Sequence, residues 1–164
     1  MFRIQRTKTC GELRLADEGT EVALNGWVDS RRDHGQLIFI DVRDRYGKTQ
    51  VIFRAEAGSD LHRLADGLRL ECVIAVRGVV ARRGAQNVNK DMPTGEVELE
   101  ARDLEILNEA KPLPFEIGEN AAALESRLKY RYLDLRRGAM QKNLLTRHKI
   151  AGLIRNYFDR KGFI

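Results

Sequence analysis

The spacing of apolar residues changes along this chain, and that change constrains the fold more than any other feature. Five segments carry the alternating or continuous apolar, β-branched pattern of strands: residues 21–32, 37–43, 49–53, 72–82 and 97–107. Between the third and fourth segments, residues 60–70 instead carry apolar side chains at i, i+3, i+4 and i+7, the spacing of an amphipathic helix. Short polar turns separate the first three segments, so these are expected to form a meander.

Three strands, a helix and two strands, within about 90 residues, is the element order of an OB barrel. We therefore predict a mainly β fold: a five-stranded OB-fold barrel over residues 1–108, with one helix between strands 3 and 4. The alternative is another small β-barrel or a β-sandwich. Gly26 lies in the middle of the first predicted strand and indicates a tight bend or a close backbone approach.

The C-terminal part of the chain follows a different pattern. Residues 109–123 contain two prolines and show no periodicity, which predicts a linker. Residues 124–137 and 140–161 then have helical spacing. One stripe of the second helix consists of Met140, Leu144, His148, Ala151, Ile154 and Phe158. Two helices cannot bury a stripe of that length against each other, so residues 124–164 are expected to open a larger domain that is incomplete here.

The charge of the chain is distributed unevenly. The formal net charge is +5, which favours a nucleic-acid partner. Residues 127–161, however, carry 11 basic and 2 acidic side chains, a net +9, which leaves −4 for all other residues. A nucleic-acid site on the barrel must therefore depend on a local cluster of side chains and not on bulk charge.

Several other classes of protein are not indicated. No apolar run approaches the roughly 18–20 residues that span a bilayer, and the N-terminal residues have no signal-peptide pattern. Cys10 and Cys72 are not spaced as a metal or redox motif and are expected to be buried or half-buried thiols, which points to the cytoplasm. We expect no metal site, no membrane partner and no catalytic residues, because the three histidines have no ligand spacing and no Gly-rich phosphate loop is present.

An aromatic residue on the second predicted strand is the first candidate for binding. Phe39 shares a face with Asp41, while the neighbouring apolar residues occupy the other face. An aromatic beside a charged residue is a poor core pattern, so Phe39 is a candidate platform for base stacking; the alternative is a core phenylalanine. Gln50, on the next strand, can donate and accept together, as a uracil or adenine edge requires; the alternative is a solvated side chain.

Basic and amide residues near strand ends complete the candidate set. Arg31 and Arg32 end the first strand and could face phosphates or pair with Asp29 and Asp33. At the end of the fourth strand, the residues in position to close the rim of a groove are Arg82, Arg83 and Asn87. The glutamates of the last strand have the pattern of a solvated face, although one could accept from the amino group of cytosine or guanine.

Four blocks of the sequence resemble one family. They are GWVDSRRDHGQLIFIDVRDRYGKTQVIF (Gly26 to Phe53), NVNKDMPTGEVELEA (Asn87 to Ala101), LEILNEAKPLPF (Leu104 to Phe115) and RLKYRYLDLRR (Arg127 to Arg137). In this order they resemble bacterial-type aspartyl-tRNA synthetase over essentially the whole chain. The resemblance implies an N-terminal OB anticodon-binding domain, a hinge, and the start of a class II catalytic domain.

The resemblance also implies a function. Members of the family form aspartyl-AMP from ATP, with Mg²⁺, and transfer aspartate to a tRNA whose anticodon is GUC. The full-length protein is expected to be a homodimer, and this fragment a monomer. The class II signature segments would lie beyond Ile164. We therefore expect this chain to bind aspartate tRNA without a cofactor and without catalysing aminoacylation.

Individual positions match the anticodon contacts of the family. Phe39 matches the aromatic that stacks on the central uracil, and Gln50 matches the residue that hydrogen-bonds this base. Further matching positions are Arg31 and Arg32 in the first-strand arginine segment, and Arg83, Asn87 and Glu98 around the other two bases. Glu98 enters mainly through the resemblance.

The sequence departs from the family at three places. Ser30 replaces the first arginine of an Arg-Arg-Arg-Asp segment, Ala81-Arg82-Arg83 replaces the usual Arg-Ala-Arg, and Gly138 replaces a proline. His34 stands where members carry leucine or histidine. Histidine resembles the relaxed enzymes that also charge asparagine tRNA, so His34 is a specificity candidate.

Three alternatives to this function are open. One is an OB module that binds single strands without sequence preference, and it predicts a strong dependence on salt. The second is a protein-interaction fragment that uses the basic C-terminal helices. The third is the asparagine-specific sibling enzyme, which shares the contact to the central uracil.

Overall fold

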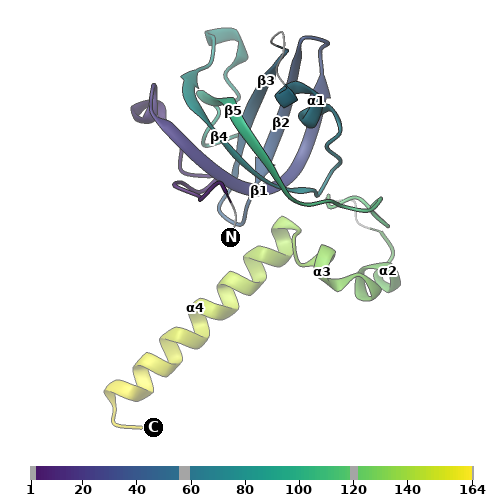
Figure 1. Ribbon diagram of the computed structural model, residues 1–164. Helices are drawn as coiled ribbons and strands as arrows, with labels where there is room; N and C mark the ends of the chain where they lie inside the picture. The colour runs from purple at the N-terminus through teal and green to yellow at the C-terminus, as the bar shows by residue number, and fades with distance from the viewer. Residues whose placement is uncertain (1–2, 56–59, 119–121, 164) are drawn as a thin grey trace. The chain divides into compact units, whose positions relative to one another are not determined.

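The computed structural model describes residues 3–55, 60–118 and 122–163. The chain divides into two compact units, Met1–Pro112 and Leu113–Ile164, and each is described by itself. The described part of the first unit contains the five strands β1 (Glu21–Asp33), β2 (Leu37–Arg43), β3 (Lys48–Arg54), β4 (Val73–Arg82) and β5 (Val97–Asn108). The helix α1 (Asp60–Asp66) lies between β3 and β4 in the chain (Figure 1).

The strands close into a barrel in the order β1-β2-β3-β5-β4. Every pairing is antiparallel except that of β3 with β5, which is parallel and joins Val51 to Leu99 and Ile52 to Glu100. This arrangement confirms the predicted five-stranded OB barrel with one helix between strands 3 and 4, so the alternative of a sandwich is wrong.

Strand β1 belongs to both sides of the barrel. Its first half pairs with β4 as far as Trp27, and its second half pairs with β2 from Trp27 onward. The strand must bend where the pairing changes, and Gly26 lies at this point. An added Cβ at Gly26 would lie 2.5 Å from the carbonyl oxygen of Arg43. The glycine therefore permits the close backbone approach that its position in the sequence predicted.

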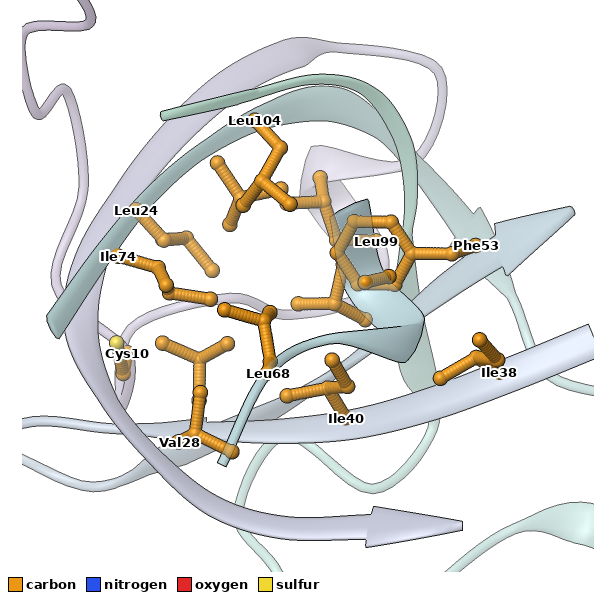
Figure 2. Close-up of a cluster of buried hydrophobic side chains, with 14 of the residues drawn as sticks. Cys10, Leu24, Val28, Ile38, Ile40, Phe53, Leu68, Ile74, Leu99 and Leu104 are labelled. Atoms are coloured by element: carbon orange, nitrogen blue, oxygen red, sulfur yellow. The ribbon is translucent and has the colours of Figure 1, made fainter. Parts of the chain in front are cut away.

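Apolar side chains fill the barrel (Figure 2). Alternate residues of each strand point inward, and Leu68, just after α1, joins them. The largest fully buried side chains are Phe53, Ile4, Leu13, Leu24, Ile38, Ile40, Ile74, Leu99, Val28, Val42, Val51 and Val76. Cys10 and Cys72 are free, buried thiols, as predicted, and burial raises the pKa of the Cys10 thiol. Because the interior uses one set of alternating residues, the other set on β2 and β3 faces outward.

Helical boundaries differ from the prediction in two places. Helix α1 ends at Asp66, four residues early, because Gly67 follows it and Glu71 takes a left-handed conformation with φ of 65°. The predicted helix over residues 124–137 is two short helices, α2 (Leu124–Lys129) and α3 (Arg131–Asp134). The helix breaks at Tyr130, whose ψ of 50° is not helical.

The second unit ends with the helix α4 (Gly138–Arg160). No residue of this helix is buried, and its large apolar side chains are exposed, including Leu153, which is 69% exposed.

Two short 3-10 turns of the first unit, η1 (Leu15–Asp17) and η2 (Ala85–Asn87), complete the described elements. Within the described residues, no helix is long and apolar enough to cross a bilayer.

We expect Gly26→Ala to lower the free energy of unfolding by about 1–3 kcal/mol, because the new methyl group overlaps backbone that cannot move without disturbing the pairing of β1 with β2. Denaturation by urea measures this loss. Gly67→Ala is the matched control, because its added Cβ would meet no atom closer than 3.7 Å. Equal stability of the two variants would contradict the close-approach explanation.

Candidate nucleic-acid interface

A groove of about 640 Å³ lies on the outward faces of β1, β2, β3 and β5 and under the segment that follows β4. Its lining residues are Arg32, His34, Leu37, Phe39, Gln50, Ile52, Arg54, Arg83, Asn87, Asn89 and Glu98. The barrel thus brings together seven of the nine residues singled out from the sequence. The exceptions are Arg31 and Arg82.

Phe39 is a half-buried side chain on the groove face of β2, while its neighbours Ile38 and Ile40 are fully buried in the barrel. It is therefore not a core phenylalanine. The ring of His34 packs edge-on against it, with the ring centroids 5.5 Å apart and the planes at 85°. This leaves an aromatic surface in the groove of the kind on which bases stack.

Gln50 is buried and its amide is hydrogen-bonded on both sides, so it is not a solvated side chain. Its carbonyl Oε1 accepts from Nη2 of Arg32 at 3.1 Å. Its amide Nε2 donates to Oε2 of Glu98 at 3.0 Å. The same Arg32 nitrogen also donates to Oδ1 of Asp41 at 3.2 Å, and Asp41 Oδ2 accepts from the hydroxyl of Ser30 at 2.7 Å. A continuous polar network therefore crosses four strands, β1, β2, β3 and β5, beside Phe39.

Arg83 and Glu98 close the network at its other end. The Nε of Arg83 donates to the carbonyl oxygen of Val97 at 3.0 Å and lies 3.7 Å from Glu98 Oε2. The Arg83 side chain is only 4% exposed and that of Glu98 only 15% exposed, so Glu98 is not part of a solvated face. Burial away from water has the largest effect on the pKa of both residues: it lowers the pKa of Arg83 and raises the pKa of Glu98. The opposite charge of the partner partly counteracts each of these two shifts.

One donor of Arg83 is unused. Its Nη2 is buried and has no hydrogen-bond partner among the described residues. An unpaired buried donor is costly, and a ligand that supplies an acceptor at this point recovers that cost. Phosphate and base oxygens are such acceptors.

The segment after β4 brings two asparagines to the groove. Tight turns shape it: the amide of Asn87 donates to the carbonyl of Gly84 at 2.8 Å, and that of Asn89 to Gly95 at 3.1 Å. The hydroxyl of Thr94 donates to the carbonyl of Lys48 at 2.6 Å and so attaches the segment to β3. The rim of the groove is therefore fixed to the strand that carries Gln50.

Four lining residues were missed in the sequence: Leu37, Ile52, Arg54 and Asn89. Strand alternation could have found two of them, because Gln50, Ile52 and Arg54 are successive outward residues of β3. Arg54 pairs with Glu100 at 2.9 Å. No sequence signal separated Asn89 from its polar neighbours.

Arg31, one of the predicted binding residues, does not line the groove. It pairs with Asp66 of α1 and with Asp33 at 3.2 Å. Adjacent residues of a strand point to opposite faces, so Arg32 and Arg31 cannot both enter the groove. Arg82 also does not line it. Among the described residues, no cluster of histidine, cysteine and carboxylate side chains could hold a metal ion.

Comparison with known proteins agrees with this geometry. Residues 22–107 match the family of OB-fold nucleic acid binding domains. The chain belongs to this family. Residues 123–164, beyond the OB domain, match class II tRNA synthetases of the D, K and N type.

The chain is 54% identical to the aspartate–tRNA(Asp/Asn) ligase of Anaeromyxobacter dehalogenans over 162 residues, which are 98% of this chain and 27% of that protein. It thus spans about a quarter of the length of the curated relatives it matches. This identity confirms the resemblance to aspartyl-tRNA synthetases, and the OB domain is of the kind that these ligases carry.

Two solved structures share the fold. The asparaginyl-tRNA synthetase of Pyrococcus horikoshii superposes with a TM-score of 0.80 at 25% identity, over 97% of this chain and 36% of that one. The aspartyl-tRNA synthetase of Entamoeba histolytica superposes with a TM-score of 0.87 at 17% identity, over 98% of this chain and 38% of that one. The second likeness concerns the fold alone.

We expect the stability of the OB domain to report the protonation of Glu98. Because burial raises its pKa, the native chain binds this proton at a higher pH than the unfolded chain does. The free energy of unfolding therefore gains a contribution as the pH falls from 7 toward about 4.3, the value of an unperturbed glutamate. Glu98→Gln removes this contribution. As the pH falls over that range, the free energy of unfolding of the native chain should therefore rise relative to that of the variant.

Urea denaturation at several pH values measures the difference. Glu96→Gln is the control, because Glu96 is exposed and precedes the same strand. If the native chain and Glu98→Gln changed in parallel with pH, the proposed burial of the carboxylate would be refuted.

Proposed function

We propose that this OB domain binds the anticodon loop of aspartate tRNA and reads the triplet GUC. The observation that carries the proposal is a groove lined by the half-buried Phe39 of β2 and by Gln50 of β3. The amide of Gln50 is held in place by Arg32 and Glu98. A stacking surface next to an oriented amide fits one unpaired base, and anticodon bases are unpaired and accessible. The names of the relatives agree with this reading.

In the proposal, the central base and the two outer bases are contacted by different side chains. The central uracil stacks on Phe39 and pairs with the remaining donor and acceptor of Gln50. Arg83, Asn87 and Glu98 contact the first and third bases, and Arg32 faces the backbone near the central base.

The proposal extends to the full-length protein, an aspartate–tRNA ligase that forms aspartyl-AMP and transfers aspartate to tRNA in the cytoplasm as a homodimer. In this proposal the OB domain supplies the binding of tRNA, and the chemistry of ATP and Mg²⁺ belongs to the full-length protein. Among the described residues, no group of histidine, cysteine and carboxylate side chains is arranged to hold a metal ion.

Asparagine tRNA is a second proposed substrate of the parent. The relative from Anaeromyxobacter is named for both tRNAs. His34, the specificity candidate, packs against the ring of Phe39. In this proposal His34 influences the base that follows the central uracil, and that base distinguishes the two anticodons.

We expect Phe39→Ala to weaken binding of a GUC anticodon stem-loop by about 1–3 kcal/mol, the usual size of a base–aromatic stack. Fluorescence titration of the full chain measures the dissociation constant. Tyr46→Ala is the matched control, because Tyr46 is 56% exposed on the β2–β3 turn and lies outside the groove. An equal effect of the two substitutions would exclude Phe39 as the platform.

The same titration separates the alternatives. Stem-loops that carry GUC, GUU and a scrambled triplet are compared at two salt concentrations. Anticodon recognition requires GUC to bind more tightly than the scrambled loop. Equal affinities with a steep salt dependence would instead identify a module that binds single strands without sequence preference.

A further inference from the structure

Asp41 is a buried carboxylate beside the groove that the proposed function does not use. It is 9% exposed, and in the β2–β3 pairing it lies directly opposite Gln50. It is not among the residues that line the groove. Its Oδ2 accepts from the Ser30 hydroxyl, and its Oδ1 accepts from Nη2 of Arg32. Both oxygens are therefore engaged by groups of β1.

The Asp41 carboxylate holds the Arg32 side chain where one guanidinium nitrogen donates to both Asp41 and Gln50. The Arg32 side chain is 51% exposed, so without a partner it would be free to adopt many rotamers. The nitrogen that contacts Asp41 is the same one that donates to Gln50. Asp41 thus places the guanidinium where it meets the amide of Gln50.

The partners of Gln50 fix which way its amide points. A guanidinium only donates, and an ionised carboxylate only accepts. Arg32 on one side therefore requires Oε1, and Glu98 on the other side requires Nε2. Rotation of the amide by half a turn would set donor against donor and acceptor against acceptor. One N–H and one lone pair of Gln50 are left, in a defined order.

This order matters because uracil and cytosine present opposite patterns on the edge that an amide reads. Uracil offers an acceptor at O4 next to a donor at N3, whereas cytosine offers a donor at N4 next to an acceptor at N3. An amide free to rotate would pair with either base. An amide held in one orientation, beside a base stacked on Phe39, pairs fully with only one of them and leaves the other with unpaired polar groups.

We propose that Asp41 is a positioning residue that sets the preference of the groove for uracil over cytosine at the central base, acting through Arg32 on the amide of Gln50. The inference rests on the proposed anticodon binding. Ser30 supports it by holding the second oxygen of Asp41, so the serine that replaces an arginine of the family has a structural role here.

The test compares two anticodon stem-loops, GUC and GCC, that differ only in the central base. The quantity measured is the ratio of their dissociation constants, GCC over GUC, for the full chain. We expect Asp41→Ala to lower this ratio about tenfold, the size of one lost donor–acceptor match. Asp41→Asn keeps an acceptor for Arg32 without the charge and should lower the ratio less.

Glu100→Ala is the matched control. Glu100 is a half-buried carboxylate of β5 that pairs with Arg54, a groove arginine. Within the described part of the chain, no hydrogen bond joins Arg54 to Gln50. We expect Glu100→Ala to leave the ratio unchanged. Thermal unfolding identifies variants that do not fold; should Asp41→Ala be one of them, Asp41→Asn and Ser30→Ala decide by the same ratio.

The outcomes separate this inference from the proposed function. Suppose that the native chain prefers GUC, and that Asp41→Ala weakens the binding of both loops but leaves the ratio unchanged. Asp41 would then have only a structural role, and the inference would be overturned while the proposed function would stand. A native ratio near one would overturn both, because no preference would exist for Asp41 to set. A ratio that falls in the Asp41 variants and not in Glu100→Ala supports the assignment.

Discussion

Filling of the barrel interior is the constraint on which the rest of this structure depends. Successive side chains of a strand point to opposite faces, so once Ile38 and Ile40 enter the core, Phe39 must point outward. The same alternation buries Val51 and turns Gln50 and Ile52 to the groove face. A shift of one residue in the register would bury the binding residues and expose the core. The hydrophobic core therefore determines the composition of the groove without contacting a ligand.

The polar network consists of charged and polar groups, each of which would be costly to bury without a partner. Buried carboxylates and arginines lose water, and this loss dominates the pKa of both Arg83 and Glu98. In the groove, however, donors and acceptors alternate from Ser30 to Arg83, so most of the lost hydration is replaced by hydrogen bonds. Such a network is rigid, and a rigid site spends less conformational entropy when it binds an RNA base.

Sequence patterns could predict the strands and most of the site because both follow from alternation. The position of Phe39 beside Asp41 in the sequence already indicates an aromatic side chain that faces outward. The distinction between Arg31 and Arg32 could not be predicted in this way, because an irregular register between Val28 and Ser30 interrupts the alternation on which such an assignment depends. Local patterns do not reveal a bulge, since it depends on the partner strand.

The burial of Gln50 could not be predicted from the sequence either. Its partner Glu98 lies 48 residues further along the chain and is brought alongside by the short parallel pairing of β3 with β5. That dependence has a kinetic consequence. Contacts between distant residues form slowly, since a long loop must close first. During synthesis, Phe39 and Gln50 leave the ribosome well before Glu98. We therefore expect the recognition groove to be among the last parts of the domain to mature, so that only a chain that has completed its barrel can engage RNA selectively.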